Sequence, residues 1–293
     1  WGPFYPSLAQ GLLKSYLGHN GISCKTIDLN AQIYKTRGKK HFDFWHPKYA
    51  QSEKLFIRKT MMEIYKEFRP LILHHMNEIK KANPLVVGCS VYDSSRILTE
   101  IFFEDLRKHF PGYKHLVGGP GVAHFMEDAS STDRLINLEH IDAVCQDEGE
   151  NALLDYVNEV KNDTGLPVAG MVYKRKGKII KGPPSMYKGK LDTLPFPDFD
   201  DCNIQHYETR ALPLHSSRGC VNKCNYCSAI GFMTNKRYPF RFRSAQRVFN
   251  EVVYLKKKYP ALEEIRFASN IDNGKISMLE DFCDLMIESG LNK

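Results

Sequence analysis

The sequence lacks long hydrophobic runs. Across its 293 residues, no stretch approaches the roughly 20 consecutive apolar residues that a membrane-spanning helix needs. The first residues also lack the charged and then apolar pattern of a targeting segment. We therefore expect a cytoplasmic protein with no membrane partner. The hydrophobic content of 42% is enough for one large domain or two ordinary ones to bury a core.

Long basic runs are also absent. The formal net charge is +7, yet the lysines and arginines are scattered or accompanied by acidic residues, apart from short clusters such as residues 256–258. This pattern predicts solvated helix faces and makes a nucleic-acid partner an unfavourable interpretation. Both ends look cut, because the chain begins at Trp1 and a helical pattern runs almost to Lys293. We therefore expect a fragment of a longer protein.

The eight cysteines do not form the pattern of a disulfide scaffold, which is typical of shorter, secreted chains. Five of them stand alone in the sequence. Of these, Cys24, Cys89, Cys145 and Cys283 fall within apolar patterns and are predicted to be small buried hydrophobic residues.

The first half alternates short β-branched runs with amphipathic helical patterns, which predicts an α/β fold with a doubly wound, Rossmann-like parallel sheet. The expected strands are 22–29, 85–90, 115–118 and 143–145, and a further strand is expected before Trp1. Ser7 is predicted to cap the first helix. We assign this domain to residues 1–165, with a charged and aromatic insertion at 31–81.

Residues 166–209 read as a hairpin, turning at Arg175-Lys176-Gly177, followed by a proline-rich linker. The last domain, residues 210–293, begins with a strand at 211–215. Ser244 is predicted to cap a helix, and a strand at 264–268 and a helix at 278–288 follow. The span holds two strand–helix units.

Three cysteines, Cys220, Cys224 and Cys227, form a C-x-x-x-C-x-x-C pattern directly after a predicted strand. Three thiolates in one loop make a soft metal site suited to an iron–sulfur cluster or zinc. A four-iron cluster held by three thiolates would leave one iron open to another ligand. Zinc with a fourth ligand from Cys202, His206 or His215 stays an alternative, although zinc ligands usually come in two separated pairs.

The triad, with Tyr226 before its third cysteine, resembles the signature of radical S-adenosylmethionine (radical SAM) enzymes. The resemblance implies that Cys220, Cys224 and Cys227 hold a four-iron four-sulfur cluster and that Tyr226 lies beside the adenine of SAM. The segment Arg241-Phe242-Arg243-Ser244, followed by Glu251, is similar to the start of the first barrel helix in cobalamin-associated members, which makes Arg243 a SAM-binding candidate. A capped helix with surface arginines is the alternative.

Two departures from the family pattern stand out. In that family, acidic residues are often found at the end of the strand that follows the first barrel helix, where this chain has Ala268-Ser269-Asn270. The family's partial TIM-type barrel has six strand–helix units, whereas this chain carries only the first two. We therefore expect the truncated barrel to be catalytically incomplete by itself.

The first domain resembles the cobalamin-binding domain that precedes many radical SAM enzymes. The resemblance rests on three strand ends and implies a cobalamin site lined by Ser90, Tyr92, Gly118, Gly119, Pro120, Glu148 and Gly149. The glycines would let a bulky planar ligand approach, or simply form a turn. Residues 148–150 could equally be a favourable acidic helix start. No Asp-x-His-x-x-Gly loop is present, so cobalamin is expected without a histidine ligand from the protein.

The resemblance implies an enzyme with a four-iron four-sulfur cluster, SAM and cobalamin, a small-molecule substrate and an external electron donor of the flavodoxin or ferredoxin type. Methyl transfer to an unactivated carbon or phosphorus is the expected reaction, with radical cyclisation or rearrangement also found in the family. Two alternatives stay open. They are a radical SAM methylthiotransferase acting on tRNA and a non-catalytic cobalamin- or zinc-binding module.

Overall fold

A computed structural model describes residues 3–37, 52–123, 130–187, 189–222, 224–227 and 239–291. The chain forms two compact units, of which the first is Leu29–Tyr187 and the second combines Pro3–Asp28 with Lys188–Lys293. These units do not follow the predicted domain ranges, since residues 3–28 were expected in the first domain. None of the described helices is long and apolar enough to cross a membrane.

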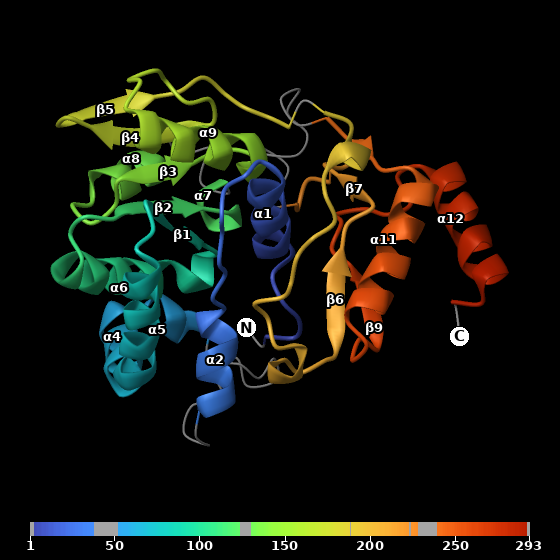
Figure 1. Cartoon of the computed structure of the whole chain (residues 1–293), viewed down its shortest axis with the longest axis horizontal. Coiled ribbons are helices and arrows are strands. Elements are labelled where there is room, and N and C mark those ends of the chain that lie inside the picture. Colours follow the sequence, from blue (N-terminus) through green and yellow to red (C-terminus); the bar gives the residue numbers. More distant parts are fainter. Residues whose placement is uncertain are drawn as a thin grey trace. The chain divides into compact units, whose positions relative to one another are not determined.

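A five-stranded mixed sheet forms the centre of the first unit (Figure 1). In sheet order, the strands are β1 (Val86–Ser90), β2 (Lys114–Gly118), β3 (Ala143–Cys145), β4 (Met171–Arg175) and β5 (Lys178–Lys181). β1, β2 and β3 are parallel, as predicted, whereas β4 and β5 are antiparallel. The hairpin expected in a separate segment therefore extends the sheet. The order follows the chain, so the described strands show no reversal of the doubly wound kind.

Helices cover both faces of this sheet. Because alternate strand residues point to opposite faces, the strands contribute to two separate apolar clusters. Val117, Val144 and Val172 belong to a cluster with the helices α4 (Arg58–Glu67), α5 (Arg69–Ala82), α6 (Arg96–His109) and α8 (Ser130–Asn137). Leu116 and Met171 belong to a second cluster with α9 (Gly149–Asn162). The unit is therefore a three-layer α/β structure.

The segment predicted as an insertion supplies part of the core. Its described portion contains most of α2 (Leu29–Thr36), a 3₁₀ helix at Ser52–Phe56, and the helices α4 and α5. Ile33, Met61, Ile72 and Met76 from these helices are buried in the first cluster. Residues 31–37 and 52–81 thus complete one face of the sheet. Shorter elements of the unit are a 3₁₀ helix at Asp93–Ser95 and α7 (Pro120–Ala123).

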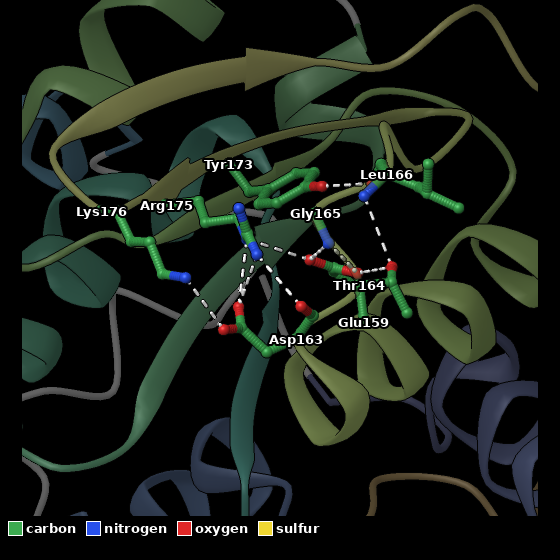
Figure 2. A network of polar contacts seen from close by, with 8 residues as sticks. All are labelled: Glu159, Asp163, Thr164, Gly165, Leu166, Tyr173, Arg175 and Lys176. Atoms are coloured by element: carbon green, nitrogen blue, oxygen red, sulfur yellow. Dashed lines mark hydrogen bonds and ion pairs between the residues drawn. The ribbon is translucent and has the colours of Figure 1, made fainter.

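Polar contacts fasten the β4–β5 hairpin to the end of α9 (Figure 2). Arg175 lies 2.9 Å from the carboxylate of Asp163 and 3.3 Å from that of Glu159, and Glu159 also accepts the backbone N–H of Gly165 at 2.9 Å. Lys176 and Gly177 both have positive φ, as a tight hairpin turn between two strands requires. The predicted turn is confirmed, and the hairpin is held to both the sheet and the helix.

The second unit contains a parallel pair, β6 (Ala211–Leu214) and β9 (Glu264–Phe267), joined through α11 (Ala245–Lys258). α12 (Ile276–Ser289) follows β9 and ends at Gly290, whose φ of 68° is left-handed. The other elements are α1 (Leu8–His19), β7 (Ser217–Arg218), β8 (Arg241–Phe242) and 3₁₀ helices at Leu191–Thr193 and Ile204–His206. Leu214 packs with Val248 and Phe282, so both long helices cover the pair. Two strand–helix units are present, as predicted.

Three local predictions are wrong. Residues 22–28 form no strand, and the amide of Thr26 instead donates to the carboxylate of Asp201 at 2.8 Å. Ser7 precedes α1 without a capping hydrogen bond from its side chain. Cys283 is exposed, because it follows Phe282 on α12 and neighbouring helical positions point about 100° apart.

Candidate functional site

A short antiparallel neck precedes and follows the predicted cluster cysteines. β7 and β8 pair Ser217 with Phe242 and Arg218 with Arg241, so the intervening chain leaves and returns at one place. Gly219 opens this loop with a φ of 81°, and a Cβ there would lie 3.0 Å from the carbonyl oxygen of Pro239. Glycine is therefore required on both conformational and steric grounds. We call residues 219–240 the cysteine loop.

The three cysteines are free thiols in this loop. Cys220 and Cys224 are half-buried and Cys227 is exposed. The amide of Asn222 donates to the Sγ of Cys220 at 3.4 Å, and the amide of Cys227 donates to the carbonyl of Cys224 at 3.0 Å. Among the described residues, no group of three or more His, Cys, Asp or Glu side chains is arranged to hold a metal ion. The loop therefore offers three soft ligands whose thiols are not gathered.

The two predicted SAM contacts lie in contrasting surroundings. Tyr226 is 91% exposed. Arg243 is only 3% exposed, and its guanidinium donates to Glu251 at 2.6 Å and to the carbonyl of His215 at 2.9 Å. Burial raises the pKa of Glu251 although Arg243 acts in the opposite direction. Arg243 thus joins α11 to the end of β6, which favours a supporting role over direct contact with a ligand.

The residues of the zinc alternative do not assemble with the triad among the described residues. His215 is buried, and that burial, reinforced by the charge of Arg218, lowers its pKa. Cys202 is half-buried, and burial raises the pKa of its thiol to about 11.

Of the other isolated cysteines that were predicted as buried, Cys145 is buried, whereas Cys24 and Cys89 are half-buried. Cys145 is buried in the second apolar cluster, and Cys89 packs against the first. Burial raises the pKa of each thiol to about 12. Both therefore stay protonated and apolar at neutral pH.

In the first unit, the predicted cobalamin residues lie at three strand ends. Ser90 ends β1 and is in register with Gly118, which ends β2. The hydroxyl of Ser90 is buried and has no hydrogen-bond partner within the described structure. Tyr92 is about half exposed, and Pro120 begins α7. The paired strands therefore place beside the glycines a buried hydroxyl that lacks a hydrogen-bond partner among the described residues.

The chain itself occupies the space that these glycines leave. A Cβ on Gly119, whose φ is 98°, would lie 2.9 Å from the Oγ of Ser90 and 3.0 Å from the amide nitrogen of Val91. A Cβ on Gly121 would lie 2.7 Å from the carbonyl carbon of Tyr92. The close approach at Gly119 and Gly121 is therefore made by the neighbouring loop of the chain, whereas the sequence predicted the approach of a ligand.

The acidic residues after β3 bind backbone. Asp147 accepts the amide of Ser185 at 2.8 Å, and Glu148 accepts the amide of Tyr187 at 2.7 Å. Gly149 begins α9, so Glu148 is also the N-cap residue, although its side chain makes no capping hydrogen bond. Both carboxylates hold the segment after β5, a role that the sequence analysis missed. The acid-rich stretch was visible, but its partners are almost 40 residues away.

Contacts between the start of the cysteine loop and the chain after β9 were not predicted from the sequence. Ser216 donates its hydroxyl hydrogen to Asp272 at 2.6 Å, and Ser217 donates to the carbonyl of Ile271 at 2.5 Å. Asp272 lies two residues past the end of the Ala268-Ser269-Asn270 stretch. The sequence feature that could have indicated these contacts is an acidic residue, Asp272, shortly after the predicted strand at 264–268.

Comparison with known proteins yields relatives in both sequence and structure. The chain is 26% identical over 275 residues to cytidylyl-2-hydroxyethylphosphonate methyltransferase of Streptomyces wedmorensis, covering 87% of this chain and 49% of that protein. It is 22% identical over 192 residues to the anaerobic magnesium-protoporphyrin IX monomethyl ester cyclase of Synechocystis sp., covering 64% of this chain and 36% of the cyclase. No family model matches the chain.

The fold is similar to that of the apo form of OxsB, a cobalamin-dependent S-adenosylmethionine radical enzyme. The TM-score is 0.53 with 19% sequence identity, and the match covers 74% of this chain and 30% of OxsB. The predicted resemblance to cobalamin-dependent radical SAM enzymes is confirmed. The chain spans less than half the length of each of these proteins. The part of the chain that resembles them combines a mixed α/β unit, a parallel strand pair and the cysteine loop.

Proposed function

We propose that the chain is part of a cobalamin-dependent radical SAM methyltransferase. The observation that carries the proposal is the C-x-x-x-C-x-x-C loop on a two-strand neck directly after β6, in a chain that resembles such enzymes. In this proposal, Cys220, Cys224 and Cys227 hold a four-iron four-sulfur cluster. The donor set fits, because three soft thiolates suit iron–sulfur chemistry and a backbone N–H already donates to one sulfur.

The proposed SAM site uses the residues around the cysteine loop. Tyr226 offers an exposed ring on which adenine can stack. Arg243 holds the end of β6 through the carbonyl of His215. When bound, the cluster and cobalamin supply reductive cleavage of SAM and a transferable methyl group, respectively. The second unit then corresponds to the first two strand–helix units of a partial barrel.

We assign cobalamin to the first unit as a Rossmann-like binding domain. The unsatisfied hydroxyl of Ser90, beside Gly118 and Gly119 at the carboxyl ends of β1 and β2, supports this assignment. Tyr92, Pro120, Glu148 and Gly149 complete the proposed lining. No protein histidine is assigned to cobalt.

The relatives suggest what the whole enzyme acts on. Methyl transfer is our preferred reaction because one relative is a methyltransferase, and we propose an unactivated carbon or phosphorus as the acceptor. Radical ring closure is the second candidate, because another relative is a cyclase. In either case, we propose a small-molecule substrate and an external electron donor of the flavodoxin or ferredoxin type.

Two experiments on the purified chain, cluster reconstitution and cobalamin binding, test the cofactor assignments. Anaerobic reconstitution with iron and sulfide should load both elements in equal amounts, and Cys224→Ser should reduce that loading while Cys283→Ser, an exposed cysteine outside the loop, should not. Hydroxocobalamin should bind with the spectrum of a form lacking a histidine ligand, and Ser90→Val should weaken its binding. Zinc uptake without iron, or a histidine-ligated cobalamin spectrum, would contradict the proposal.

A further inference from the structure

The two serines that lead into the cysteine loop are held by the chain between β9 and α12, residues 268–275, which we call the brace. Ser216 and Ser217 are each only 2% exposed. The amide of Ser216 donates to the Oγ of Ser269 at 2.9 Å, and the two hydroxyl oxygens lie 3.2 Å apart. The hydroxyl of Ser216 also lies 2.6 Å from the Oδ1 of Asp272. Both peptide and side chain of Ser216 are therefore fixed by the brace.

Asp272 sets the direction of this small hydrogen-bond ring. An ionised carboxylate can only accept, so the hydroxyl of Ser216 must donate to it. The Oγ of Ser216 is then an acceptor for the hydroxyl hydrogen of Ser269, whose own oxygen accepts the amide of Ser216. Charge-assisted hydrogen bonds are the stronger kind, and the bond from Ser216 to Asp272 is partly buried. Removing the carboxylate would therefore loosen the whole ring.

The brace also contacts the chain that returns from the cysteine loop. A Cβ on Gly274 would lie 2.5 Å from the ring of Phe240, so that ring packs directly on the brace backbone. The ammonium group of Lys275 lies 4.1 Å from the centre of the Phe242 ring. The brace thus touches both arms of the neck, one through hydrogen bonds and the other through aromatic contacts.

We propose that the brace fixes the neck of the cysteine loop and that Asp272 is a positioning residue for the cluster ligands. The inference rests on the proposed function, because it assigns Asp272 a role in presenting Cys220, Cys224 and Cys227 to a cluster. Asp272 acts through Ser216, four residues before Cys220, and contacts no thiol. Asp272 lies beyond the Ala268-Ser269-Asn270 stretch that replaces the family's acidic residues, and here it supports the loop.

Substitution of Asp272 tests this role in the reconstituted chain. Asp272→Ala removes the acceptor, whereas Asp272→Asn keeps an acceptor oxygen. Asp281→Ala, at an exposed position of α12, is the matched control. We expect Asp272→Ala and Ser216→Ala each to weaken SAM binding to the cluster by about tenfold. The paramagnetic resonance spectrum of the cluster measures this binding. Asp272→Asn should restore most of the affinity, and the double variant should be no worse than either single variant.

Hydrogen exchange of the apoprotein separates failure of this inference from failure of the proposed function. Asp272→Ala should speed exchange of the amides of Ser216 and Arg243, which bond to the Oγ of Ser269 and the carbonyl of Ser216. If the wild-type chain takes up no cluster, the proposed function fails. The exchange result still shows whether Asp272 holds the neck of the cysteine loop. Exchange and SAM affinity equal to those of Asp281→Ala would overturn the inference.

Discussion

Gly119 and Gly177 have left-handed backbones in different surroundings. A Cβ on Gly119 would press against Ser90 and the backbone of Val91, whereas a Cβ on Gly177 meets nothing within 4 Å. We predict that Gly177→Ala costs about 1 kcal/mol of unfolding free energy, from φ alone. Gly119→Ala should cost about 3 kcal/mol or more, because steric strain adds to that penalty. Denaturant unfolding of both variants measures the difference, and equal losses would argue against the tight strand end.

His115 on β2 is a fully buried titratable residue. It stacks on Phe103 with ring centres 4.7 Å apart, and its Nδ1–H donates to the carbonyl of His140 at 2.9 Å. Burial, with the nearby charge of Arg107, lowers the pKa of His115 to about 4. The unfolded state, with a pKa near 6.5, therefore binds more protons between these values.

Stability of the first unit should consequently be highest above pH 6.5 and fall as the pH drops toward 4, by on the order of 3 kcal/mol from His115. His115→Gln, which cannot titrate, should flatten this part of the pH profile. His74→Gln, at an exposed position on α5, is the control. A profile unchanged by His115→Gln would rule out this residue as the source.

At the scale of elements, helix capping gives a direct test. The Oγ of Ser244 accepts the amide of Arg247 at 3.2 Å, while Ser7 precedes α1 without such a bond. Ser244→Ala should lower the unfolding free energy by about 1 kcal/mol, and Ser7→Ala should change it little. Thermal unfolding of the two variants provides the comparison. A larger effect at Ser7 would contradict the capping assignment.

Periodicity predicted most elements correctly because their apolar patterns are local. The strands near Val117 and Val144 and the helix after Ser244 are examples. Periodicity failed where a contact with a residue distant in sequence decides which structure a segment forms. Residues 22–28 have an extended, apolar pattern, but Thr26 bonds to Asp201 instead of to a neighbouring strand. The β4–β5 hairpin was predicted, yet nothing local in its sequence specifies that β4 pairs with β3.

The same distinction holds for the candidate sites. The cysteine triad is local and could be found from its spacing, and the pairing of Ser90 with Gly118 follows from two adjacent parallel strand ends. Asp272 could not be assigned, because its partner Ser216 lies 56 residues earlier. The buried environment of Arg243 was equally hidden, since it depends on α11 packing against the end of β6.

At the scale of the whole molecule, the two compact units carry separate proposed cofactor sites. Residues 29–187 contain the strand ends assigned to cobalamin, and the second unit contains the cysteine loop. The sequence predicted both kinds of site and grouped α1 with the first domain, whereas α1 belongs to the second compact unit. Gly11 of α1 packs so closely on the ring of Phe199 that a Cβ would lie 2.7 Å from it. That contact joins segments nearly 190 residues apart and is invisible to local patterns.

The central claim is that the cysteine loop holds a cluster with an iron open to SAM. The most direct measurement is the paramagnetic resonance spectrum of the anaerobically reconstituted and reduced chain, recorded with and without SAM. We predict a four-iron four-sulfur signal that changes when SAM is added and that Cys220→Ser, Cys224→Ser or Cys227→Ser abolishes. A cluster signal unaffected by SAM, or one that survives loss of these cysteines, would contradict the account.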